Sequence, residues 1–428
     1  MDSHRARIAL SCFSLCITSV LVTGGCGSSS ALLPAALPEA FPTLTPFQPQ
    51  ATDLENPNTS QVPSVVEPTF TPFPTRFVVS ENLYTPAQIL SAGSNIDMNV
   101  LAVYNPLTGL PVGDPSLLNR RPMVIKITNA PDSVRPQSGL TLADIVYEYY
   151  IEWGDTRFIA VMYGNDSPFV GPVRSGRYFD EHVARMYNAF LVFKFADPRE
   201  FSYLKDSALK DFLVVPGNSG CPPFVIGPAA RDSYNNIFFN TSRWAACAAS
   251  KGVDNSPQVL RGGFFSDEAL DSDLAVTRIF TRYSVYSYNY WQYDPITHKY
   301  FRYQEANDMV KGKQEAYAAL SDLQTGLPVT ADNVAVIFVP YVFKNQNEAE
   351  DEIYHIDLID SGNAYVFRDG LAVPARWNRL EENQPMLLTS LTGDPIYLRP
   401  GRTFYEVIGT SSTYTQDGSD WKFYFATP

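Results

Sequence analysis

The 428-residue sequence has little charge, few cysteines and few histidines. Charged residues make up 18% of the chain, and 45 acidic residues outnumber 32 basic ones, which gives a net charge of −13. A nucleic-acid partner that is held by bulk positive potential is therefore excluded. The four histidines are far apart and no Cys-x-x-Cys pair occurs, so we expect no metal site. Walker and Gly-x-Ser-x-Gly motifs are also absent, which removes support for nucleotide or serine hydrolases, and we expect no cofactor.

An uncharged segment of 15 residues, 8–22, follows two N-terminal arginines. It is shorter than the roughly 20 residues of a membrane-spanning helix and is followed by small residues, as in a secretory signal. The segment 21–26, Leu-Val-Thr-Gly-Gly-Cys, resembles the lipobox of bacterial lipoproteins, although Thr23 stands where that motif usually has Leu. We therefore expect residues 1–26 to be a lipoprotein signal peptide, with Cys26 lipidated and the protein anchored outside the cell membrane. A secreted protein cleaved nearby and an uncleaved anchor are the alternatives.

The two cysteines that remain after Cys26 are Cys221 and Cys247. In an oxidising compartment an even pair predicts a disulfide, and two buried free thiols are the alternative. Between Cys26 and this pair, residues 27–98 carry many of the 33 prolines in a Thr- and Ser-rich background. Neither helices nor sheets accept proline at that density, so we expect a disordered tether.

Residues 99–272 predict a mixed α/β domain. Segments rich in β-branched and aromatic residues alternate with segments of helical apolar spacing, which favours a layered α/β structure. We expect strands at 123–128, 144–151, 157–163 and 189–195, and helices at 178–188 and 198–212.

Residues 273–410 predict a smaller β-rich domain, and 411–428 are assigned to a C-terminal tail. Aromatic and polar residues alternate here, and turns such as Asp294-Pro295 and Arg368-Asp369-Gly370 separate the apolar runs. We expect strands within 276–293, 300–304, 334–340, 353–358, 364–367, 371–377 and 396–398.

Several motifs occur in an order that is known from one family. They include Asn-Pro-Leu-Thr-Gly-Leu-Pro at 105–111, Arg-Pro-Gln-Ser-Gly-Leu at 135–140, Ala-Asp-Ile-Val-Tyr-Glu at 143–148, Val-Gly-Pro-Val-Arg-Ser at 170–175 and Leu-Arg-Pro-Gly-Arg-Thr at 398–403. In these motifs the chain resembles the YerB-like lipoproteins of the DUF3048 family, over residues 105–408. The resemblance implies an exported two-domain lipoprotein without an assigned biochemical role. A His-Asn pair that is common in the family is replaced here by Tyr234-Asn235-Asn236 after Arg231.

Arginines gather in the first half of the chain and suggest an anion site. Arg174-Ser175-Gly176-Arg177 lies between an expected strand and an expected helix, where backbone N–H groups and guanidinium groups both favour phosphate or carboxylate. The candidate ligand-binding residues are Arg135, Arg157, Arg174, Ser175 and Arg177. The alternative is that the arginines form internal salt bridges. Asp144, Glu148 and Asp155 are their candidate partners, or ligands of a divalent cation.

Two weaker signals remain. His182, on an expected helix, is a candidate general base, although a surface or capping role is more usual. An aromatic run at 283–293 suggests either stacking on sugar rings or an ordinary sheet face.

Three functions follow from these signals. The first is a non-enzymatic lipoprotein that binds a wall glycan, peptide or other envelope component through the α/β domain. The second is an enzyme that acts on a phosphorylated envelope substrate at an arginine-lined cleft, and the third is a structural spacer without a ligand. We favour binding over catalysis.

Overall fold

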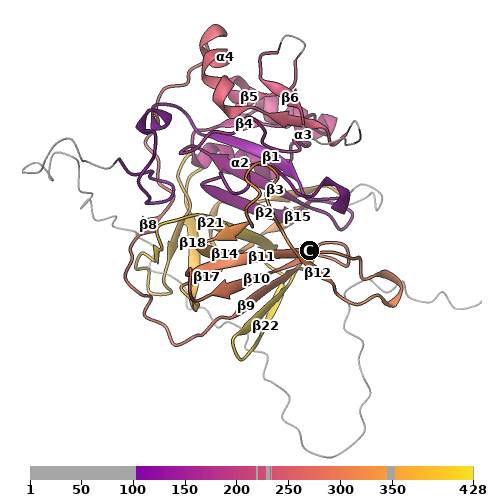
Figure 1. The fold of residues 1–428 in the computed structure, drawn as a ribbon, viewed down its shortest axis with the longest axis vertical. Coiled ribbons are helices and arrows are strands. Elements are labelled where there is room, and N and C mark those ends of the chain that lie inside the picture. The colour runs from indigo at the N-terminus through magenta and orange to yellow at the C-terminus, as the bar shows by residue number, and fades with distance from the viewer. Residues whose placement is uncertain (1–102, 218–219, 228–231, 233, 345–351, 428) are drawn as a thin grey trace, which may run out of the picture. The chain divides into compact units, whose positions relative to one another are not determined.

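The computed structural model describes residues 103–427, except for 218–219, 228–231, 233 and 345–351. The predicted signal peptide, the predicted tether and Cys26 lie outside the described residues. Strands predominate in the described part of the chain, and helices are few (Figure 1). None of the helices described there is long and apolar enough to cross a membrane.

The elements are as follows. The helices are α2 (Tyr178–Met186), α3 (Pro198–Asp206) and α4 (Trp244–Ser250), and short 3₁₀ helices lie at 115–118, 132–134, 210–212, 241–243 and 310–312. The strands before residue 273 are β1 (Met123–Thr128), β2 (Ile145–Tyr150), β3 (Thr156–Met162), β4 (Phe190–Val192), β5 (Leu213–Val214), β6 (Phe224–Ile226), β7 (Ile237–Phe239) and β8 (Phe264–Phe265). The later strands are β9 (Arg278–Arg282), β10 (Tyr288–Asp294), β11 (Lys299–Glu305), β12 (Tyr317–Ala319), β13 (Thr330–Ala331), β14 (Asn333–Val339), β15 (Tyr341–Phe343), β16 (Tyr354–Ile356), β17 (Asp360–Arg368), β18 (Leu371–Arg379), β19 (Leu387–Thr389), β20 (Tyr397–Leu398), β21 (Thr403–Gly409), β22 (Thr413–Asp417) and β23 (Asp420–Tyr424).

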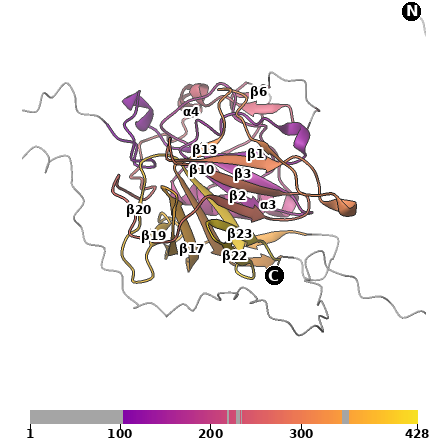
Figure 2. The same cartoon turned by 60° about the horizontal axis from the view of Figure 1, so that its bottom comes forward.

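The main sheet has ten strands in the order β19-β18-β17-β14-β21-β2-β3-β1-β4-β5. Figure 2 shows β1, β3 and β2 side by side at its centre. β2 and β21 are parallel neighbours, with Ile145 opposite Thr403 and Tyr149 opposite Val407. Because β2 lies in the first predicted domain and β21 in the second, the two predicted domains share one sheet.

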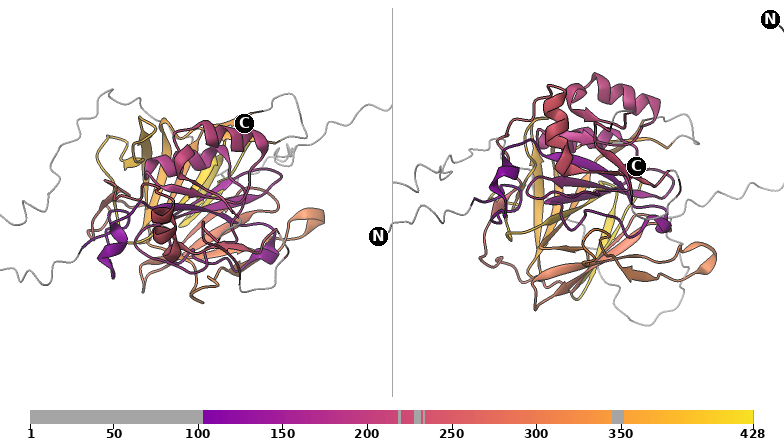
Figure 3. Two further views of the ribbon diagram at one scale, coloured as in Figure 1. Left: turned by 90° about the horizontal axis from the view of Figure 1, so that it is seen from above. Right: turned by 45° about the horizontal axis from the view of Figure 1, so that its top comes forward.

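The two faces of the main sheet are covered by different elements. Tyr149 of β2 points to the helices, and its ring centre lies 4.7 Å from that of Phe179 on α2. Phe404 of β21 points the other way, with its ring centre 4.7 Å from that of Trp291 on β10. β10 belongs to a second sheet with the order β12-β11-β10-β9-β23-β22, in which β13 also pairs with β11. The right view of Figure 3 shows the helices at the top and the orange strands of the second sheet at the bottom.

The two predicted helices, α2 and α3, begin at the predicted residues, whereas α4 was not predicted. Phe179, Val183 and Met186 are buried along one side of α2. At the start of α3 the side chain of Asp197 accepts a hydrogen bond from the Arg199 backbone N–H (2.9 Å), and Pro198 occupies the first turn. The predicted helix 198–212 ends early, because a 3₁₀ turn replaces its last residues.

The C-terminal residues do not form a tail. β22 and β23 lie at the edge of the second sheet, and β23 pairs in parallel with β9. Trp421, Phe423 and Phe425 alternate along this segment and are buried. This spacing of two is the pattern of a strand with one buried face, and our assignment to a tail overlooked it.

Cys221 and Cys247 form a disulfide, with their Cα atoms 5.6 Å apart. It joins the segment before β6 to α4, so the predicted pairing is present in the structure. The two cysteines are 26 positions apart in the sequence, and the antiparallel pair of β6 and β7 lies between them.

Candidate arginine site

Three of the predicted arginines lie close together at the edge of the main sheet where β1 and β2 end, because the charges of Arg174 and Arg177 both act on Arg157. Arg157, the second residue of β3, pairs with Thr128, the last residue of β1. The backbone of Arg174 lies beside the same strand, because its N–H donates to the Lys126 carbonyl oxygen (3.1 Å). Ligands of α/β sheets bind at the carboxyl ends of parallel strands, and β1, β2 and β4 all run toward this edge. We call Arg135, Arg157, Arg174 and Arg177 together the arginine site.

The N-terminus of α2 is occupied by the chain's own carboxylate. Asp180 accepts hydrogen bonds from the Arg177 backbone N–H (2.8 Å), from the Lys126 ammonium (2.8 Å) and from the Tyr149 hydroxyl (2.6 Å). Burial lowers the pKa of Lys126 to about 8, although Asp180 acts in the opposite direction. The helix terminus that we predicted as an anion seat is therefore already neutralised.

Two of the four arginines are held in ion pairs. Arg177 donates through Nε to Glu152 (2.9 Å), and its Nη1 lies 3.4 Å from a carboxylate oxygen of Glu200. Arg135 pairs with Glu305 of β11 and also donates to the Glu305 carbonyl oxygen (2.8 Å). The partners thus differ from the carboxylates Asp144 and Glu148 that the sequence suggested.

The other two arginines have no such partner. Arg157 is only 7% exposed, and its Nε and Nη1 atoms are buried without a hydrogen bond in the described part of the chain. Arg174 is half-buried, and its Nε is likewise buried without a hydrogen-bond partner among the described residues. Burial, and then the neighbouring Arg177, lower the pKa of Arg157 to about 10, so its guanidinium remains charged at neutral pH. A buried cation without hydrogen bonds is costly, which marks Arg157 and Arg174 as places for an external anion.

Other residues border the arginine site, and the sequence had singled out Ser175 and Asp155 among them. Ser175 is half-buried, and its hydroxyl forms no hydrogen bond within the described residues. The charge of Asp155 acts on Arg157 and Arg174. Lys194 lies at the end of the strand expected at 189–195, and Tyr234 lies in a loop, so the sequence did not place either residue at the site. The Arg174 guanidinium lies 5.8 Å from the centre of the Tyr234 ring.

The remaining candidate carboxylates have structural roles. Asp144 accepts hydrogen bonds from the Asn105 amide (2.7 Å) and from the Tyr163 and Gly164 backbone N–H groups (2.7 and 3.0 Å). Glu148 points between the two sheets and pairs with Arg302. Among the described residues, no group of three or more His, Cys, Asp or Glu side chains is arranged to hold a metal ion.

We had expected a surface or capping role for His182, but the residue is buried. It is 7% exposed, and its Nδ1 accepts a hydrogen bond from Arg379 (2.8 Å). Burial, and then the charge of Arg379, lower its pKa to about 3. A histidine that stays neutral and is covered by an arginine is a poor general base near neutral pH.

The aromatic run splits between the two faces of the second sheet. Tyr283, Tyr288 and Trp291 are buried. Tyr290 faces outward, but its ring is stacked on that of Tyr303, with ring centres 4.6 Å apart and an angle of 5° between the ring planes. Because that stacked face is covered, Tyr290 offers little surface for stacking on a sugar.

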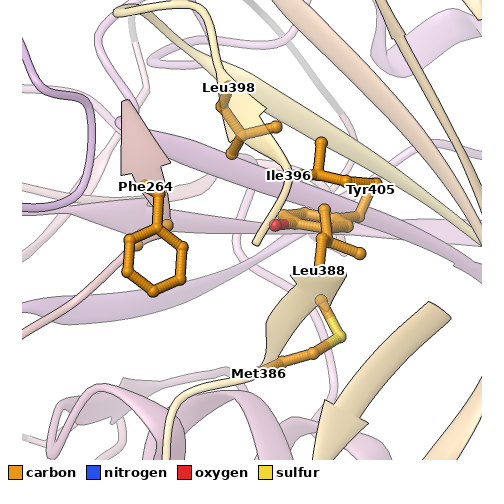
Figure 4. A pocket seen from close by; sticks show the side chains of 8 residues that line it. Phe264, Met386, Leu388, Ile396, Leu398 and Tyr405 are labelled. Atoms are coloured by element: carbon orange, nitrogen blue, oxygen red, sulfur yellow. The ribbon is translucent and has the colours of Figure 1, made fainter. Parts of the chain in front are cut away.

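Two other pockets in the described part of the chain lie away from the arginine site. The side chains in Figure 4, which come from the β8, β19, β20 and β21 region, are apolar apart from the Tyr405 hydroxyl and leave no room for a water molecule. A pocket of about 240 Å³ lies beside Asp144, Asp332 and Arg402. Its charges are satisfied, because Asp332 pairs with Lys299 (2.5 Å) and accepts from the Arg402 backbone N–H (2.8 Å).

Both halves of this fold match known domain families. Residues 107–254 match the N-terminal domain of DUF3048, described as a protein of unknown function, and residues 279–405 match the DUF3048 C-terminal domain. The chain belongs to the DUF3048 family.

Relatives agree with this assignment. A Bacillus subtilis (strain 168) protein named "Putative lipoprotein YerB" is 23% identical over 318 residues, which are 71% of this chain and 85% of that protein. The crystal structure of the YerB protein from Bacillus subtilis matches with a TM-score of 0.59 at 22% identity, and the match covers 72% of this chain and 96% of that one. The resemblance that the motifs indicated is thereby confirmed.

Proposed function

We propose that the protein is a lipoprotein anchored outside the cell membrane, and that its first half binds an anionic component of the cell envelope at the arginine site. The name of the Bacillus relative and the uncharged segment before Cys26 support the anchor. The site supports the binding role.

One observation carries the binding proposal. Arg157 is a charged side chain, 7% exposed, whose Nε and Nη1 atoms are buried and lack hydrogen-bond partners in the described residues. Buried nitrogen atoms in proteins rarely lack a hydrogen-bond partner, and where the protein supplies none, a ligand or an ordered water does. Arg174 lies close enough to interact electrostatically with Arg157, so an anion placed between them receives two charge-assisted contacts.

The proposal is tested by pairing two arginine variants. Arg157→Met nearly keeps the volume of the side chain and removes a buried charge that has no hydrogen bonds, so we expect the melting temperature of the ligand-free protein to stay the same or to rise. Arg177→Met leaves Glu152 and Glu200 without their cation, so we expect a clear loss of stability. The measurement is thermal melting with and without inorganic phosphate or pyrophosphate.

In the wild type we expect both anions to raise the melting temperature. Arg157→Met should abolish this increase, because each charge-assisted contact contributes about 1.5–3 kcal/mol, or about ten- to a hundredfold in affinity. If neither anion shifts the wild-type melt, or if Arg157→Met keeps the whole shift, the arginine site does not bind anions.

A further inference from the structure

The arginine site has an aromatic rim, formed by Phe195 and Tyr234. Phe195 is 66% exposed and Tyr234 is 70% exposed. The Lys194 ammonium lies 5.7 Å from the Phe195 ring centre and 5.8 Å from the Tyr234 ring centre. Because Arg174 also lies against Tyr234, the rim and the cations form one continuous surface.

Phe195 occupies a backbone conformation that its side chain disfavours. Its φ is 60°, in the left-handed region that bulky residues rarely adopt. The conformation is fixed by the sheet edge, since the Phe195 carbonyl oxygen accepts a hydrogen bond from the Gly176 N–H (3.0 Å). Asn or Gly would fit this backbone better, and an exposed ring gains little from packing. An exposed and strained aromatic residue beside a binding site points to contact with a ligand.

Asp155 adds a third chemical feature. It is half-buried, and its carboxylate forms no hydrogen bond within the described part of the chain. Its charge acts on both Arg157 and Arg174. A free phosphate ion at the arginines is repelled by this carboxylate, whereas a ligand with hydroxyl groups can donate hydrogen bonds to it.

From these three features we infer that the ligand is a sugar phosphate. The inference rests on the proposed function and specifies its ligand. The phosphate contacts Arg157 and Arg174, a sugar hydroxyl donates to Asp155, and the apolar face of the sugar ring packs on the Phe195 and Tyr234 rim. A flat anionic membrane fits less well, because it meets the exposed rings but cannot reach a guanidinium that is 7% exposed.

Calorimetric titrations compare inorganic phosphate, α-D-glucose 1-phosphate and glucose, with vesicles of phosphatidylglycerol as a fourth probe. We expect the wild type to bind glucose 1-phosphate about tenfold more tightly than phosphate. Phe195→Asn suits the left-handed backbone and removes the ring. This variant and Tyr234→Ala should each reduce the preference for glucose 1-phosphate. The exposed Tyr397 on β20 provides a control, because Tyr397→Ala should leave the preference unchanged.

Asp155→Asn gives the sharpest test, since the two ligands should respond in opposite directions. Affinity for inorganic phosphate should rise several-fold because a repelling charge is removed, and affinity for glucose 1-phosphate should fall because an acceptor is weakened.

Equal affinities for phosphate and glucose 1-phosphate in the wild type would overturn the sugar phosphate but leave anion binding intact. Tight binding of vesicles that depends on Phe195 would show that the ligand is a membrane surface and not a sugar phosphate. If no probe binds, the proposed function fails together with the inference.

Discussion

Arg302 on β11 and Glu148 on β2 form a fully buried ion pair, although the two family domains divide these residues between different halves of the chain. The same guanidinium donates to Glu406 of β21 (2.9 Å), which also accepts from the Trp291 indole N–H (2.8 Å). One cation therefore joins both sheets and both halves. Together with the pairing of β2 and β21, this arrangement makes the described part of the chain one folding unit.

The first prediction is that Arg302→Met strongly destabilises the protein. Removing the guanidinium leaves two buried carboxylates without a cation, so we expect a loss of about 3–5 kcal/mol in chemical denaturation. Arg278 of the same sheet forms an exposed pair with Asp420, and Arg278→Ala should cost less than about 1 kcal/mol. Similar losses for the two variants would show that the buried pair does not hold the halves together.

The second prediction concerns the disulfide between Cys221 and Cys247. Replacing both residues by serine should lower the free energy of unfolding by roughly 3–4 kcal/mol, because the bridge closes a loop of 26 residues in the unfolded chain. Denaturation of both proteins, with and without reductant, provides the measurement. Reductant should lower the stability of the wild type and leave the double variant unchanged, and peptide mapping that finds both wild-type thiols free would contradict the bridge.

The third prediction is a pH dependence that comes from His182. Its pKa is about 3 in the folded protein and near 6.5 when unfolded, so the unfolded chain binds more protons between these values. Stability from this group is therefore complete above about pH 7 and falls as the pH decreases. Between pH 7.5 and pH 5 the wild type should lose about 2 kcal/mol more than His182→Gln in urea denaturation. Parallel pH profiles for the two proteins would rule out His182 as the cause.

About half of the strands in the described residues were predictable from the sequence, because their patterns are local. The apolar runs that became β1, β2 and β3 are long and rich in β-branched residues, and Pro198 marked the start of α3. The shared sheet was not predictable in this way. The pairing of β2 with β21 joins residues more than 250 positions apart, and a single sequence carries no signal for that neighbour.

The sequence predicted which arginines form the arginine site but not which of them are paired with carboxylates. The loop and strand positions of Arg135, Arg157, Arg174 and Arg177 indicated a cluster, yet the sequence could not show which members have partners. Glu305 reaches Arg135 from β11, 170 residues away. The aromatic rim was missed because exposure and a positive φ at Phe195 are properties of the folded chain, not of its local pattern.

The fourth prediction concerns the anchor. Cys26 lies outside the described residues, so its lipidation stays a prediction from the lipobox-like segment. Cys26→Ala should remove the mature-sized protein from the detergent phase in Triton X-114 partitioning, whereas Cys16→Ala, within the hydrophobic segment, should not. A Cys26→Ala protein that is still processed and still enters the detergent phase would exclude lipidation at this residue.

The fifth prediction is that a single substitution in the turn between β2 and β3 stabilises the protein. Trp153 and Gly154 have φ values of 56° and 86°, and the Asp155 N–H donates to the Glu152 carbonyl oxygen (2.9 Å), as in a type I′ turn. Asn is favoured at the first of these positions, whereas the Trp153 side chain is 60% exposed and gains little from packing. Trp153→Asn should therefore raise the free energy of unfolding by about 1 kcal/mol.

Trp153→Ala separates the backbone effect from the loss of the ring. Alanine removes the same aromatic surface but keeps the unfavourable positive φ, so it should be less stable than Trp153→Asn by several tenths of a kcal/mol or more. Urea denaturation of the three proteins gives the order. If Trp153→Ala equals or exceeds Trp153→Asn in stability, the turn holds no backbone strain at this position, and the exposed tryptophan is stabilised by contacts of its ring.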